Sequence, residues 1–149
     1  HQIIGYNKRL DTLQAGILRV KLKRLDRWNQ ARRKNAQIYD QLLKDIEEIR
    51  PLHVKDFAEP VHHMYVVRAK QRDELRKYLA KKGIATGIHY PIPLHLQPAF
   101  KFLEYKKGDF PVAEELANEV LSLPMFPELT EKEIKFVVRE IKSFYSQVK

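Results

Sequence analysis

Hydrophobic residues recur every three or four positions along the first third of the chain, which is the spacing of one face of an α-helix. The apolar stripe runs from Leu10 to Val20 and resumes after Trp28. We therefore predict mostly helix over residues 10–49, either as one long helix or as two helices with a bend near Trp28. The helix should end at Arg50-Pro51, because a residue that precedes proline is pushed out of the helical region.

Patterns typical of strands then alternate with patterns typical of helices. β-Branched and aromatic residues predict strands over 62–69 and 84–89, and a short extended piece over 121–127. A helix is predicted from Asp73 to Lys82, another capped by Asp109 with Pro111 in its first turn, and a third after a capping box of Thr130 and Glu133.

These elements predict an α/β fold of the α+β two-layer type, with a long N-terminal helix followed by a small sheet covered by helices. Residues 1–50 would form a helical linking segment, and residues 51–149 a small α/β domain. Gly83 should end the helix before it as a left-handed residue. The side chains predicted to face the core from the last helix are Ile134, Val137, Ile141 and Phe144.

The excess of positive charge raises the question of whether the chain binds a nucleic acid or another anionic partner. The chain has 28 Lys and Arg against 19 Asp and Glu, a net charge of +9, and eight of the cations lie between Arg19 and Lys34. Such a cluster can meet the phosphates of a nucleic acid or of another anionic ligand. It is also typical of the solvated side of an amphipathic helix, which we favour. A nucleic-acid partner is therefore not expected.

Several classes of site are excluded by what the sequence lacks. The chain has no cysteine, so thiolate nucleophiles and disulfides are absent. Its histidines show no zinc-type spacing, because His62 and His63 are adjacent and His89 and His95 are six apart. We therefore predict no metal site. The sequence contains no run of about 18 apolar residues, so no membrane span is predicted. The N-terminus has neither a signal-peptide pattern nor an initiator methionine, so we expect a cut or processed cytoplasmic chain.

The segment GIHYPIPLHLQPAF, residues 87–100, concentrates polar aromatic chemistry on a stiff stretch of chain. It holds His89, Tyr90 and His95 among three prolines, which disfavour both helix and ladder pairing. An imidazole held by adjacent prolines can donate a hydrogen bond to a phosphate or hydroxyl oxygen. From the residues alone, packing and ligand contact remain equally open for these three side chains.

Several phrases, taken together and in order, resemble one family. They are GYNKRLDTLQAGIL, YVVRA, GIATGIHYPIPLHLQPAF and GDFPVAEELANEVLSLPMFPELT, followed by the closing helix. The chain resembles the second half of the DegT/DnrJ/EryC1/StrS aminotransferases over essentially all its 149 residues. These are pyridoxal-phosphate (PLP) enzymes of the aspartate-aminotransferase fold, type I, which aminate keto sugars carried on nucleotides.

The resemblance implies roles for particular residues. Asn7 and Arg9 match a phrase that contacts the PLP phosphate of the neighbouring subunit in a homodimer, while His89, Tyr90 and His95 match a loop that borders the nucleotide-sugar cleft. The family's Schiff-base lysine belongs to an N-terminal large domain to which nothing in this sequence corresponds. No catalytic residue is therefore assigned, and the chain should be inactive alone.

The resemblance thus implies the C-terminal part of an amino-sugar aminotransferase, with glutamate as the amino donor. Two other readings remain open. The first is a free-standing binding or regulatory module that keeps the fold without catalysis. The second is a basic nucleic-acid-binding domain that uses the cations of residues 19–34.

Overall fold

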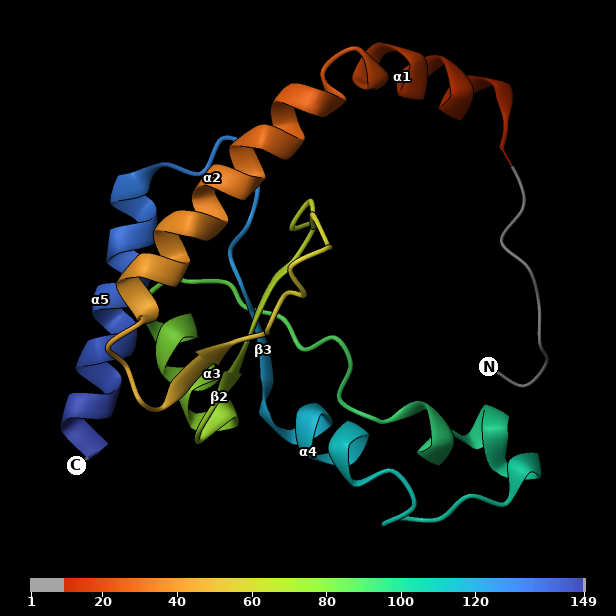
Figure 1. Cartoon of the computed structure of the whole chain (residues 1–149), viewed down its shortest axis with the longest axis vertical. Coiled ribbons are helices and arrows are strands. Elements are labelled where there is room, and N and C mark those ends of the chain that lie inside the picture. The colour runs from red at the N-terminus through yellow and green to blue at the C-terminus, as the bar shows by residue number, and fades with distance from the viewer. Residues whose placement is uncertain (1–9, 149) are drawn as a thin grey trace.

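Two helices open the computed structural model, which describes residues 10–148. Helix α1 spans Thr12–Leu22 and helix α2 spans Leu25–Leu43. The chain therefore forms two helices rather than one, and the break lies at Lys23 and Arg24, just before the expected position (Figure 1). The predicted end at Arg50-Pro51 is wrong, because the helix stops at Leu43 and residues 49–51 are recruited into the sheet.

The sheet has three antiparallel strands in the order β1-β2-β3. Their bounds are Ile49–Pro51 for β1, Tyr65–Ala69 for β2 and Val120–Leu123 for β3. Ile49 pairs with Ala69, and Tyr65 pairs with Leu123. The predicted strand over 84–89 contributes only one isolated bridge, between Gly87 and Ser122. The predicted strand over 62–69 is confirmed in its second half, since His62–Met64 precede β2.

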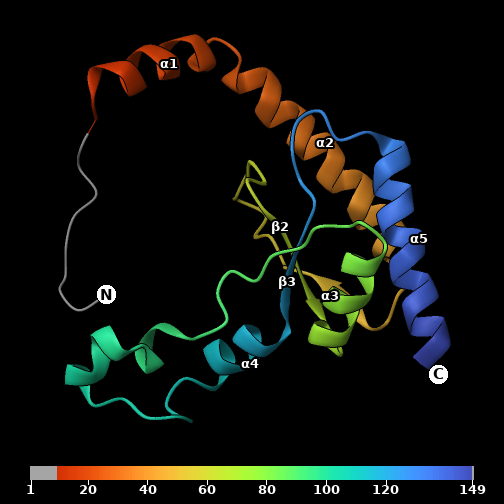
Figure 2. The ribbon, with the colours of Figure 1, turned by 180° about the vertical axis from the view of Figure 1, so that it is seen from behind.

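Three further α-helices complete the domain, and one face of the sheet carries its core. They are α3 at Arg72–Lys81, α4 at Pro111–Glu119 and α5 at Glu131–Val148. Helices α2 and α5 lie side by side, with α3 beside α5 (Figure 2). The largest fully buried side chains come from these helices and the sheet: Tyr39, Leu43, Leu75, Leu79, Leu121, Ile134, Ile141 and Val67. The predicted helix-and-strand fold is confirmed.

Side chains alternate along β2, with Tyr65, Val67 and Ala69 buried in the core. Arg68 points to the other face, where it pairs with Glu115 and Glu119 of α4 at 2.5 and 2.6 Å. Strand β3 is buried along its whole length. None of the described helices is long and apolar enough to cross a membrane.

The predicted capping box starts α5. The backbone N–H of Thr130 donates to Glu133 Oε2 at 2.8 Å, and the N–H of Glu133 donates to Thr130 Oγ1 at 3.3 Å. The Thr130 hydroxyl also donates to Glu133 Oε2 at 2.6 Å, and this bond, followed by the one from the Thr130 backbone N–H, lowers the pKa of the Glu133 carboxyl. Two N–H groups at the helix start are satisfied reciprocally, which lets α5 begin where the core needs Ile134.

We expect Thr130→Ala to lower the free energy of unfolding by about 1 kcal/mol, because the side-chain acceptor of the cap is lost. Urea unfolding followed by far-ultraviolet circular dichroism measures the change. Ser146→Ala is the control, since this exposed serine only donates to the carbonyl of Lys142 within the same helix. Equal midpoints for Thr130→Ala and the unsubstituted chain would contradict the cap's role.

Candidate functional site

The candidate site lies on the long loop that leaves the sheet at Gly87 and returns at α4. Two backbone hydrogen bonds fix its start, from Gly87 N to Ser122 O at 3.1 Å and from Ser122 N to Gly87 O at 2.8 Å. Beyond this bridge the loop forms two short 3₁₀ helices, Leu94–Leu96 and Pro98–Leu103, and extends away from the sheet (Figure 1). The loop is thus anchored at the middle of β3 and is irregular elsewhere.

His89 and Tyr90 lie together at the root of this loop. The Nδ1 atom of His89 is 2.9 Å from Ser122 Oγ. The Tyr90 ring meets the His89 ring edge-on, with 5.6 Å between centroids. Tyr90 is 71% exposed, and His89 is also exposed. Both side chains are therefore accessible to a ligand, and their predicted substrate contact stays a prediction.

His95 has a different environment from the other two. Its Nε2 donates to Glu114 Oε1 at 3.0 Å, and its side chain is only 7% exposed. Its ring packs on Phe110, with 4.9 Å between centroids. The structure therefore places His95 between the loop and α4, with Nε2 already paired, and its predicted substrate contact stays a prediction.

Glu114 is a residue that our reading of the sequence missed. Its Oε1 accepts the N–H of Gly108 at 2.7 Å in addition to the bond from His95. The Gly108 N–H is the largest cause that lowers the pKa of the Glu114 carboxyl, and the His95 bond acts in the same direction against the cost of desolvation. One carboxylate thus ties two parts of the loop to α4. The sequence signal is weak, because a glutamate in a helical first turn is ordinary.

The lowered pKa gives this tie an expected pH dependence. The pKa of an unfolded-state glutamate is about 4.3. When folding lowers this pKa, the carboxylate stabilises the fold at every pH above the unfolded pKa, and this stabilisation is lost as pH falls through the folded pKa. We expect the urea midpoint of the unsubstituted chain to fall more steeply below about pH 4 than that of Glu114→Gln. Glu104→Gln, on the same exposed loop, is the control. Parallel pH curves for the unsubstituted chain and Glu114→Gln would refute the tie.

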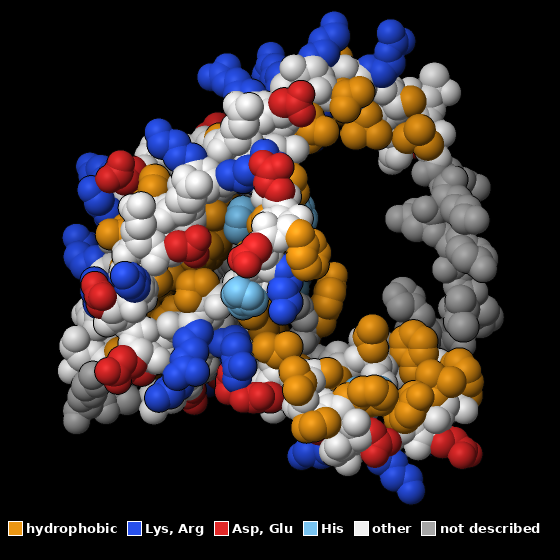
Figure 3. All heavy atoms as spheres, viewed as in Figure 1, with side chains coloured by type: hydrophobic (Ala, Val, Ile, Leu, Met, Phe, Trp, Pro, Cys, Tyr) orange, Lys and Arg blue, Asp and Glu red, His pale blue; other side chains and the backbone are white. Residues whose placement is uncertain are grey.

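A second feature is an apolar surface facing a hollow. Helix α1 has no buried residue, although it carries large apolar side chains that are more than half exposed, including Leu13, Ile17 and Leu22. Leu94 and Phe102 on the loop are 68% and 66% exposed. Figure 3 shows such side chains bordering a hollow between α1 and the loop. Exposed apolar surface of this extent is typical of an interaction face.

The described residues form no PLP site by themselves. A lysine that carries the cofactor as an imine needs a desolvated pocket, and every described lysine is exposed. Asn7 and Arg9, the predicted phosphate contacts, lie outside the described residues.

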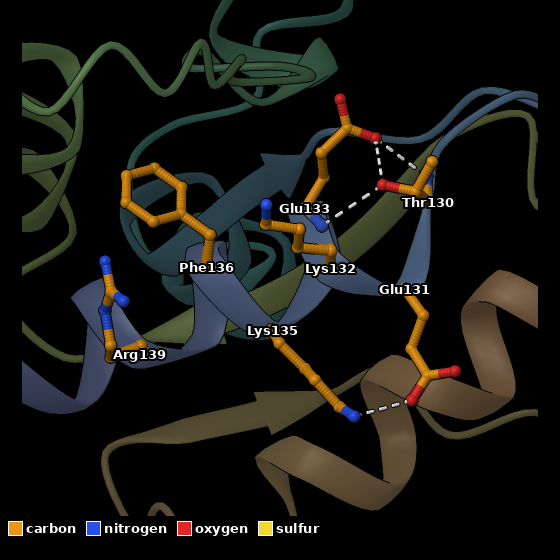
Figure 4. A pocket seen from close by; sticks show the side chains of 7 residues that line it. All are labelled: Thr130, Glu131, Lys132, Glu133, Lys135, Phe136 and Arg139. Atoms are coloured by element: carbon orange, nitrogen blue, oxygen red, sulfur yellow. Dashed lines mark hydrogen bonds and ion pairs between the residues drawn. The ribbon is translucent and has the colours of Figure 1, made fainter.

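Elsewhere, an open pocket of about 940 Å³ runs along the start of α5 (Figure 4). Two of its cations already have partners, since Lys135 pairs with Glu131 at 2.7 Å and Arg139 stacks over Phe136.

Comparison with known proteins identifies the family of this chain. The described residues form a small antiparallel sheet backed by helices, with an accessible His-Tyr loop. The chain matches the DegT/DnrJ/EryC1/StrS aminotransferase family over residues 1–142, and it belongs to this family. The resemblance seen in the sequence is thus confirmed.

Individual relatives show which kinds of protein the chain is similar to and how much of each it covers. The chain is 50% identical to a pleiotropic regulatory protein of Geobacillus stearothermophilus, over 97% of this chain and 40% of that protein. It is 39% identical to the dTDP-3-amino-3,4,6-trideoxy-alpha-D-glucose transaminase of Streptomyces venezuelae, over 99% of this chain and 39% of that enzyme. Other relatives are aminotransferases of UDP-linked sugars. The chain thus spans about 40% of the length of the curated relatives it matches.

The fold is shared with solved enzymes. The crystal structure of S. venezuelae DesV in complex with a ketimine intermediate superposes with a TM-score of 0.87 at 38% identity, covering 97% of this chain and 39% of DesV. A candidate sugar aminotransferase of Streptococcus pneumoniae, solved in a PLP form, superposes with a TM-score of 0.83 at 26% identity, over 95% of this chain and 37% of that one. The fold class expected from the sequence, a partial α/β domain of a PLP aminotransferase, is confirmed.

Proposed function

We propose that the chain is the C-terminal part of a PLP-dependent aminotransferase that transfers an amino group to a keto sugar linked to a nucleotide. The observation that carries this proposal is the family match over residues 1–142, combined with a span of about 40% of the relatives' length. The apolar surface on α1 and the loop supports it, because such a surface needs cover that a larger enzyme supplies.

In the intact enzyme, PLP would supply the electron sink for moving a proton at the amino-bearing carbon. Asn7 and Arg9 would donate hydrogen bonds to the phosphate of the neighbouring subunit's PLP, since an amide and a guanidinium suit phosphate oxygens. This role requires a homodimer. Glutamate is the proposed amino donor, and the Schiff-base lysine would come from the N-terminal large domain.

On the substrate side, His89 and Tyr90 would contact the nucleotide-linked sugar from the root of the loop, and His95 would border the same cleft. The net charge of +9 favours an anionic diphosphate-bearing substrate through long-range attraction. The cations of residues 19–34 lie on α1, on α2 and at the break between them, and they are exposed or half-buried.

A second candidate is a regulatory module that keeps the fold without catalysis. The name of the G. stearothermophilus relative, at 50% identity, favours it. Nucleic-acid binding through the cations of residues 19–34 is a weaker possibility, and it predicts binding to duplex DNA that falls steeply with salt.

The test is amino transfer by the intact protein that contains this chain. With PLP and L-glutamate, we expect 2-oxoglutarate and an amino sugar from dTDP- or UDP-linked keto sugars, detected by mass spectrometry. Borohydride reduction should leave a PLP adduct on one lysine outside these 149 residues. Intact protein that binds PLP but transfers no amino group would favour the regulatory module. A stoichiometric adduct on one lysine within this chain would overturn the proposed division of roles.

A further inference from the structure

Ser122 lies at the junction of the sheet and the candidate loop. On one side it pairs with Val66 of β2, and on the other its backbone exchanges two hydrogen bonds with Gly87. The residue is only 6% exposed. A residue held by neighbours on both sides offers its side chain in a fixed direction, which is the requirement for a group that orients another.

The hydroxyl of Ser122 has one partner within the described chain, the His89 ring. Nδ1 is 2.9 Å from Oγ, and a buried hydroxyl needs an acceptor for its proton. If the hydroxyl donates to Nδ1, the neutral ring carries its own proton on Nε2. The Nε2 atom has no hydrogen-bond partner among residues 10–148, and His89 is exposed. This atom is therefore free to donate to a ligand oxygen.

Gly87 makes room for this arrangement. A Cβ atom built on Gly87 would lie 2.6 Å from Cε1 of His89 and 3.3 Å from its Nδ1. The ring thus rests against the glycine backbone at a distance that no other residue type permits without displacing it. Gly87 and Ser122 are bridged to each other, so the contact and the hydrogen bond are set by the same pair of residues.

From this geometry, and resting on the proposed function, we propose that Ser122 and Gly87 are positioning residues for His89. The Ser122 hydroxyl holds Nδ1, and the missing side chain at Gly87 leaves room for the ring at the root of the loop. Together they present Nε2–H as a donor to a hydroxyl or phosphate oxygen of the nucleotide-linked sugar. Neither residue touches the substrate, and each acts through the orientation and tautomer of the imidazole.

Nitrogen-15 NMR of the intact protein, labelled at histidine, tests the positioning directly. The His89 signals are identified by their loss in His89→Gln. We expect a proton on Nε2 and an acceptor-type Nδ1 in the unsubstituted protein, and a mixture of tautomers in Ser122→Ala and Gly87→Ala. Ser143→Ala should leave the His89 signals unchanged, because that serine contacts Tyr78 and Gln147 instead. A proton on Nδ1 in the unsubstituted protein, or no change in Ser122→Ala, would overturn the proposal.

Kinetics then separates positioning from general structure. We expect the KM for the nucleotide sugar to rise about fivefold in Ser122→Ala, as for one lost neutral hydrogen bond, while kcat stays within about twofold. In a His89→Gln background the further effect of Ser122→Ala should vanish, since the two residues act as one unit. An equal fivefold rise in both backgrounds would reject positioning through His89. An inactive intact protein would count against the proposed function, while the NMR result would still decide the positioning.

Discussion

Replacing Arg72 with methionine is expected to lower the free energy of unfolding by about 3 kcal/mol. The Arg72 side chain is only 8% exposed, and its Nη1 donates to the carbonyls of Ala117 and Val120 at 3.2 and 3.0 Å. Both carbonyls belong to buried residues where α4 passes into β3. Methionine fills similar space without a donor, so two buried acceptors lose their partner, at a cost of roughly 1–3 kcal/mol each.

Arg76→Met supplies the matched comparison. Arg76 is exposed on the same helix, and its replacement should change the unfolding free energy by less than about 0.5 kcal/mol. Urea unfolding of the two variants and the unsubstituted chain measures both effects. If Arg72→Met and Arg76→Met unfold at the same midpoint, the contacts of Arg72 do not hold α4. Because α4 carries Glu114 and therefore holds His95, loss of Arg72 should also loosen the candidate loop.

Removing the His89 side chain should have the largest effect on activity. In the intact enzyme we expect His89→Ala to lower kcat/KM for the nucleotide sugar roughly 10- to 100-fold, the range for one lost hydrogen bond to a charged group. His89 is exposed at the root of the loop, and its ring is already oriented by Ser122, so little ordering cost offsets the contact.

His63→Ala is the control for this prediction, because His63 is an exposed imidazole just before β2 and outside the candidate loop. Steady-state kinetics with varied nucleotide sugar at saturating amino donor gives both values of kcat/KM. An active enzyme whose kcat/KM is unaffected by His89→Ala would remove His89 from the substrate site.

The sequence predicted best those features that depend on neighbours along the chain. The Thr130–Glu133 box and the left-handed Gly83, with a φ of 76°, were read correctly, because both follow from local backbone chemistry. The inward face of α5 was also predicted, since its period is local and Ile134, Val137, Ile141 and Phe144 are buried as expected.

Features that depend on distant partners were missed. Ile46 and Ile49 continue the helical spacing, yet Ile49 is taken by a strand that pairs with Ala69, twenty residues further on. Likewise, residues 84–89 have the composition of a strand, but β3 offers Gly87 only a single bridge. Asp109 was expected to cap α4, but its carboxylate accepts the N–H of Lys106, and Phe110 stands at the cap position.

The candidate site shows the same division. Sequence picked out His89, Tyr90 and His95 as a group because they share a proline-rich stretch. It did not distinguish the environments of His89 and His95, because these are set by hydrogen bonds to Ser122 and Glu114. Those partners lie 33 and 19 residues away from their histidines along the chain. A polar partner brought in by tertiary folding leaves no local periodicity to read.

Helix α1 has a consequence for how assembly can be observed. It has 11 residues, none of them buried, and Asp11 caps it through the N–H of Gln14. Isolated helices shorter than roughly 12–15 residues are marginal in water. Its amide protons should therefore exchange rapidly with deuterium in the 149-residue chain and slowly once its apolar face is covered. The amides of β2 and β3 should be protected both in the 149-residue chain and in the assembled protein. The exchange rate of the α1 amides, compared with theirs, therefore reports whether the apolar face of α1 is covered.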